Sequence, residues 1–84
     1  MLDLTVHNET GVPIVALFVF PSGQDQGTDR LDAQVLAPGA FRRVALGHGS
    51  DCVYDVVARL ANGRTERRPA HNACRSQAIR LGVR

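Results

Sequence analysis

Residues 52–63 read Cys52-Val53-Tyr54-Asp55-Val56-Val57-Ala58-Arg59-Leu60-Ala61-Asn62-Gly63 and decide the fold class. From Cys52 to Leu60 every second side chain is apolar, which is the period of a strand with one buried face. An Asn-Gly pair follows at Asn62 and Gly63. Such a pair between extended segments predicts a two-residue type I′ turn, because both central positions of that turn need positive φ. The stretch therefore predicts an antiparallel hairpin.

The turn also predicts a register for this hairpin. If Ala61 pairs with Arg64, then Arg59 lies opposite Glu66 and the two side chains form a cross-strand ion pair. Arg67 then falls on the apolar side of the strand. A charged side chain there indicates an edge strand whose guanidinium group reaches solvent.

The same register brings the two cysteines of the chain together. Cys52 falls opposite residue 73, one position short of Cys74. A bulge near Pro69, where proline supplies no N–H group to the ladder, would correct this difference. The two sulfur atoms are therefore expected to be neighbours.

The remaining pattern predicts one all-β domain over residues 1–84. Apolar residues make up 44% of the chain and charged residues 21%, which is usual for a globular domain of this length. No helical period occurs, which excludes parallel βαβ units. We expect a small antiparallel sandwich or open barrel of six to seven strands. Besides the hairpin, the expected strands cover residues 2–7, 12–20, 41–46 and 78–83, and residues 31–36 form a short strand or one helical turn.

The segment 12–20 is apolar at both alternating sets of positions. It is shorter than the ~20 residues that a membrane helix needs, so no membrane span is predicted. A doubly apolar strand is buried on both faces or uses one face for an interface. We expect Phe18 and Phe20 in the core. The opposite set, Val15, Leu17 and Val19, would form a subunit or partner interface if exposed.

Charge is distributed unevenly along the chain. Residues 1–41 contain one arginine and five acidic residues, whereas residues 42–84 contain nine arginines and three acidic residues. The hairpin region could carry a basic strip that binds an acidic protein or nucleic acid. Nucleic acid is disfavoured, because no stacking aromatic residues are interleaved with the arginines. A solvated edge that deters strand pairing is the simpler interpretation. The strip consists of Arg64, Arg67, Arg68 and Arg75.

Three aspartates occupy the loop region that contains glycine after the second strand. Asp25, Asp29 and Asp32 could offer oxygen ligands to calcium, but their spacing does not match an EF-hand. A solvated acidic loop is the favoured interpretation.

Several short motifs resemble those of a known family. They are Val6-His7-Asn8-Glu9-Thr10-Gly11, Pro21-Ser22-Gly23, Pro38-Gly39 and Cys52-Val53-Tyr54-Asp55. In them the chain is similar to a family of small bacterial proteins, most of them exported, that have no assigned function and keep a second cysteine downstream. The resemblance implies one compact domain and a paired-cysteine framework, and it implies no catalytic residue. The chain departs from the family by having Gln26-Gly27 in the acidic loop in place of a tryptophan.

The cysteines thus have two competing interpretations. The favoured one is a disulfide between Cys52 and Cys74 in an oxidising compartment, which would add about 3 kcal/mol of stability on the chain-entropy model. The alternative is a tetrahedral zinc site, because His48 and His71 lie close in sequence to the cysteines and supply the imidazoles that zinc prefers. That site would consist of His48, Cys52, His71 and Cys74.

These observations predict a non-enzymatic binding or assembly module, stapled by the disulfide, that uses no cofactor. Its partner is an unknown protein or a second copy of the chain. We expect a periplasmic or extracellular location. The first residues enter a strand pattern directly and lack the basic and apolar segments of a leader, so a cytoplasmic location stays open beside export after leader removal. A small zinc-binding protein is the second hypothesis, and a basic-surface binder of an acidic partner or nucleic acid is the third.

Overall fold

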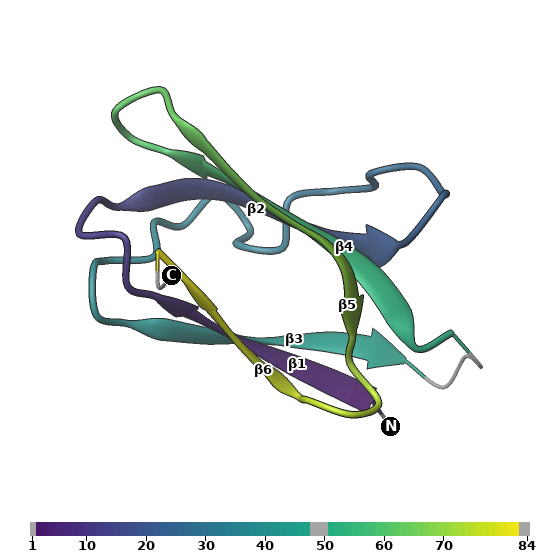
Figure 1. Ribbon diagram of the computed structural model, residues 1–84. Helices are drawn as coiled ribbons and strands as arrows, with labels where there is room; N and C mark the ends of the chain where they lie inside the picture. The colour runs from purple at the N-terminus through teal and green to yellow at the C-terminus, as the bar shows by residue number, and fades with distance from the viewer. Residues whose placement is uncertain (1, 48–50, 83–84) are drawn as a thin grey trace.

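The computed structural model describes residues 2–47 and 51–82, and these form six strands in two sheets (Figure 1). One three-stranded sheet has the order β3-β1-β6 and the other has the order β2-β4-β5. The predicted all-β sandwich is confirmed. No helix in the described ranges is long and apolar enough to cross a bilayer. The strands are β1 (Leu2–Asn8), β2 (Ile14–Pro21), β3 (Phe41–Gly47), β4 (Val53–Leu60), β5 (Thr65–Asn72) and β6 (Ala78–Leu81).

The last strand differs from the expectation of antiparallel pairing throughout. β6 runs parallel to β1, with Val6 opposite Ile79 and Asn8 opposite Leu81. Parallel neighbours need a crossover connection between them. Here the chain supplies it by passing through the whole β2-β4-β5 sheet before it returns to β1.

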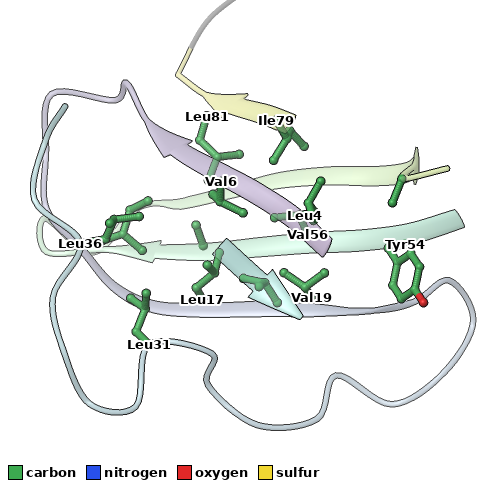
Figure 2. Packing of buried hydrophobic residues seen from close by; sticks show 14 of the residues in the cluster. Leu4, Val6, Leu17, Val19, Leu31, Leu36, Tyr54, Val56, Ile79 and Leu81 are labelled. Carbon is green, nitrogen blue, oxygen red and sulfur yellow. The ribbon is translucent and has the colours of Figure 1, made fainter. Parts of the chain in front are cut away.

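The core lies between the two sheets (Figure 2). Leu4 and Val6 of β1 face Leu17 and Val19 of β2 and Val56 of β4, and none of these side chains is more than 1% exposed. These residues occupy alternate positions along their strands, so their side chains all point to the same face of each sheet and fill the space between the two sheets.

The faces of β2 were predicted wrongly, and a bulge explains why. The pairing of β2 with β4 shifts by one residue between Ile14 and Ala16. An extra residue in a strand reverses which side chains point inward beyond it. Leu17 and Val19 are therefore in the core, while Phe18 and Phe20 lie on the outer face of the sheet, half-buried.

The long loop between β2 and β3 runs back alongside β2 and covers its free edge (Figure 1). One oxygen of Asp29 accepts hydrogen bonds from the N–H groups of Leu17 and Leu31, both at 2.9 Å. The Arg30 guanidinium donates to the carbonyl of Val19 in β2 and to that of Ala45 in β3, each at 3.3 Å. The loop thereby joins the two sheets along one side of the sandwich.

Asn8, at the end of β1, is a fully buried polar residue. Its side-chain nitrogen donates to the carbonyls of Val12 at 2.8 Å and Leu36 at 2.9 Å. Its side-chain oxygen accepts from the hydroxyl of Thr10 at 2.7 Å. One amide thus holds together the end of β1, the turn to β2 and the end of the long loop, and burial strengthens each bond.

The hairpin has a different register from the predicted one. The Gly63 N–H donates to the carbonyl of Leu60 at 3.0 Å, and the Leu60 N–H donates to the carbonyl of Arg64 at 2.8 Å. The loop therefore has three residues, with Gly63 at a φ of 87°. This turn needs positive φ only at its last position, and Asn-Gly satisfies it as well as a two-residue turn. The predicted Arg59–Glu66 pair is wrong, because Arg59 lies opposite Thr65.

Candidate functional site

The disulfide between Cys52 and Cys74 is present, as predicted, with the Cα atoms 5.2 Å apart. A bulge in β5 positions it. The β4–β5 register shifts by one residue between Val56 and Tyr54, next to Ala70, whose φ is 56°. The three-residue turn displaces the β4–β5 pairing by one residue from the predicted register, and the bulge moves the pairing back by one residue. As a result, the Ala73 N–H donates to the carbonyl of Cys52 at 2.7 Å.

Asn72 orders the turn that carries the second cysteine. Its side-chain oxygen accepts from the N–H groups of Cys74 at 3.0 Å and Arg75 at 3.2 Å, and its carbonyl accepts from Ser76 at 3.1 Å. Asparagine side chains commonly close turns in this way. Cys52 is half-buried and Cys74 is exposed, so the disulfide lies at the surface.

The alternative zinc site loses two of its four proposed ligands in this arrangement. The sulfur atoms of Cys52 and Cys74 are bonded to each other and cannot also bind a metal as thiolates. His71 has its Nε2 atom 2.9 Å from the carbonyl oxygen of Ser76. His48 lies outside the described residues. Within residues 2–47 and 51–82, no group of three or more His, Cys, Asp or Glu side chains could hold a metal ion.

The four arginines of the predicted basic strip do not form one surface. Arg64, just before β5, and Arg68, within β5, lie on one side, where both line the same pocket. Arg67 lies on the opposite side of the sheet, paired with Val57 of β4. Arg75 lies in the turn after β5. The structure thus brings two of the four together.

The pocket that these two arginines line has a volume of about 240 Å³. It opens between the β4–β5 hairpin and the wall formed by Thr10 and Gly82. Val12 and Leu60 contribute apolar side chains to its lining, and most of the other lining residues are polar or charged. The residues that line it are Thr10, Val12, Leu60, Asn62, Arg64, Glu66, Arg68 and Gly82.

Two of the three loop aspartates proposed as calcium ligands have structural partners. One carboxylate oxygen of Asp29 accepts the N–H groups of Leu17 and Leu31. Asp32 forms a salt bridge with Arg42 of β3 at 3.3 Å. Asp25 is exposed. These contacts fit the favoured interpretation of a solvated acidic loop.

The outer face of the β2-β4-β5 sheet carries an apolar row. Phe18 of β2 pairs with Val57 of β4, and Val57 pairs with Arg67 of β5. Phe18 and Phe20 are half-buried and Val57 is only 5% exposed, whereas Val53, at the start of β4, is 39% exposed. Aromatic side chains that reach the surface beside arginine are frequent at protein-binding surfaces.

Arginines border this apolar row. Arg59 and Arg67 project from the same face, and neither forms a salt bridge within the described ranges. Asp55, an acidic residue on this face, accepts hydrogen bonds from the Ala70 N–H at 2.9 Å and the Ser22 hydroxyl at 2.7 Å. These two bonds, together with the positive charge of Arg67, lower the pKa of Asp55 below its usual value of 3.8.

Comparison of the chain with protein-family models, with curated proteins and with solved structures gave no match. The resemblance drawn from the short motifs therefore stays a prediction.

Sequence reasoning identified Arg64 and Arg68 but missed the rest of their pocket. The alternation Arg64-Thr65-Glu66-Arg67-Arg68 already indicates that Glu66 shares a face with the two arginines. No local pattern indicates that Thr10 and Gly82, which are distant in the chain, form the opposite wall. The outer position of Phe18 was missed because the bulge in β2 leaves no signature in the sequence.

Proposed function

We propose that this domain is an exported, non-enzymatic binding module that recognises a protein partner through the outer face of the β2-β4-β5 sheet. The observation that carries the proposal is the outer face of this sheet, where the half-buried ring of Phe18 lies on the same side as Arg59 and Arg67. Export is supported by the disulfide between Cys52 and Cys74, because disulfides persist mainly in oxidising compartments.

The charges on this face favour a partner that is acidic around an apolar contact. Arg59 and Arg67 lack salt bridges within residues 2–47 and 51–82, and the carboxylate of Asp55 is already hydrogen-bonded. Carboxylates of a partner would pair with the two guanidinium groups, while its apolar side chains would cover Phe18. A second copy of the chain would instead bring arginines against arginines. The partner is therefore a different, acidic protein.

Site-specific photo-crosslinking in the organism that makes the protein tests this proposal. A benzophenone amino acid replaces Phe18, and in a matched control it replaces Phe41, which is 63% exposed on the other sheet. We expect a crosslinked product of one discrete mass from position 18 and none of that mass from position 41. The double variant Arg59→Glu with Arg67→Glu should abolish the product, because it reverses the charge around the patch.

Two results would overturn the proposal. One is the same set of products from positions 18 and 41, which would mean that contact is not specific to this face. The other is a product with twice the mass of the chain, which would show self-association. Circular dichroism of each variant establishes that the sheet structure is retained.

A further inference from the structure

The pocket beside β5 has an excess of positive charge. Arg64 and Arg68 contribute two guanidinium groups and Glu66 contributes one carboxylate. An Nη2 atom of Arg68 lies 3.9 Å from Oε1 of Glu66, so these two charges balance each other. The Arg64 guanidinium forms no hydrogen bond or salt bridge within the described part of the chain. Its charge is therefore uncompensated at the pocket.

A second hydrogen-bond donor lies next to Arg64. The side-chain oxygen of Asn62 accepts the backbone N–H of Arg64 at 3.0 Å, which determines how the amide group is oriented. The amide nitrogen of Asn62 then has no partner among residues 2–47 and 51–82. A ligand that accepts hydrogen bonds can therefore contact both the Arg64 guanidinium and the Asn62 amide.

The opposite wall of the pocket is held by a hydrogen bond and by close backbone packing. The hydroxyl of Thr10 is held by Asn8 at 2.7 Å, and the backbone of Thr10 packs directly against Gly82. Leu60, only 6% exposed, contributes apolar surface from the core. The volume of about 240 Å³ equals that of roughly eight water molecules. The pocket has room for a small organic molecule and none for a folded chain.

We propose that this pocket binds a small oxyanion, a carboxylate or phosphate group carried by a compact molecule. The planar guanidinium of Arg64 can donate two parallel hydrogen bonds to such a group. The amide of Asn62 adds a neutral donor. Glu66 sets the limit on ligand charge, because its carboxylate repels a ligand that carries several phosphates. This site is separate from the outer face of the sheet and does not depend on the partner proposed there.

Amide NMR titration tests the site with defined probes. Sodium acetate and sodium phosphate are added separately, and sodium chloride at matched ionic strength is the control. We expect saturating shifts at the amides of Thr10, Gly63 and Gly82. Arg64→Gln should weaken binding about tenfold or more, since a hydrogen bond to a charged group is lost.

Two further variants separate pocket binding from general attraction of anions. Arg67→Gln removes the same charge from the opposite face of β5, and we expect less than a twofold change in affinity. Glu66→Gln should bind the same probe more tightly, a gain that a damaged fold cannot produce. Shifts with phosphate alone, with acetate alone or with both support the proposal and identify the group that is recognised. Shifts that chloride reproduces, or equal weakening by Arg64→Gln and Arg67→Gln, would overturn it.

Discussion

At the scale of single residues, Gly82 is the one glycine in residues 2–47 and 51–82 that other parts of the chain approach closely, and the approaching segment is the turn after β1. A Cβ atom on Gly82 would lie 2.5 Å from the carbonyl oxygen of Glu9 and 2.6 Å from the Cα atom of Thr10. The φ of Gly82 is 95°, a region that other residues rarely adopt. The close approach arises because β6 continues its pairing with β1 through the Glu9 N–H, which donates to the carbonyl of Leu81 at 2.9 Å.

Gly82→Ala is therefore expected to lower the free energy of unfolding by about 2–3 kcal/mol, because steric overlap adds to backbone strain. Gly39→Ala is the matched control. The φ of Gly39 is 84°, but no atom lies within 4 Å of its Cβ position, so strain of about 1 kcal/mol is the only expected cost. Urea unfolding of both variants measures the difference. Equal losses would show that the contact with Glu9 and Thr10 costs nothing.

At the scale of elements, the bulge in β5 depends on a carboxylate of the neighbouring strand. Asp55 of β4 accepts the N–H of Ala70 inside the bulge, and this bond is the main reason why the pKa of Asp55 is lowered. The hydroxyl of Ser22 contributes a second bond. A carboxylate with a lowered pKa stabilises the fold when it is ionised. Its contribution is complete above the unfolded pKa and is lost as the pH falls through the folded pKa.

We expect Asp55→Asn to be less stable than the wild type at neutral pH and to approach it as the pH falls below about 4. Ser22→Ala should show the same trend with a smaller amplitude, since it removes one of the two bonds. Denaturant midpoints between neutral pH and strongly acidic pH, with the disulfide intact, measure both effects. A constant difference between the wild type and Asp55→Asn across this range would contradict the prediction.

The strands themselves follow from local alternation, and their exact pairing does not. The period of two along β4 predicted its buried face correctly, since Tyr54, Val56, Ala58 and Leu60 all face the core. The turn at Asn62-Gly63 fits two loop lengths equally well, and the choice between them depends on the whole strand pairing. The disulfide was predicted correctly although the register at the turn was not. The turn displaces the β4–β5 pairing by one residue, and the bulge in β5 displaces it by one residue in the opposite direction.

The candidate sites were less predictable than the strands because they are made by contacts between distant segments. Arg64 and Arg68 were identified as basic, but the wall of Thr10 and Gly82 exists only after β6 has joined β1. The outer position of Phe18 likewise depends on the shift in the β2 pairing with β4. Such features depend on the fold as a whole and not on neighbouring residues in the chain.

At the scale of the whole molecule, the loop that carries Arg30 joins the two sheets on one side, and the disulfide links the residue before β4 to the turn after β5. The disulfide links residues 22 positions apart, and on the chain-entropy model closing a loop of this length contributes about 3 kcal/mol. Small domains have a total stability of only about 5–15 kcal/mol. The disulfide is thus a large share of what keeps the chain folded.

The double variant Cys52→Ser with Cys74→Ser should unfold at a lower denaturant concentration than the oxidised wild type, by an amount equal to about 3 kcal/mol. Reductant should move the wild type to the same midpoint and leave the variant unchanged. Intact mass before and after reduction should differ by two hydrogen atoms. A wild-type midpoint that is insensitive to reductant would contradict this account.

The buried position of Asn8 has a consequence for how the protein is produced. Asn8, Glu9 and Thr10 form an Asn-x-Thr triplet, which glycosylating secretory pathways modify at the asparagine nitrogen. In the folded domain that nitrogen is inaccessible and donates to the carbonyls of Val12 and Leu36. A sugar attached before folding would replace one of the two donor hydrogens, and there is no space for it at this fully buried position. Expression through a eukaryotic secretory pathway would therefore divide the product into folded, sugar-free molecules and glycosylated molecules that are unable to close the sandwich.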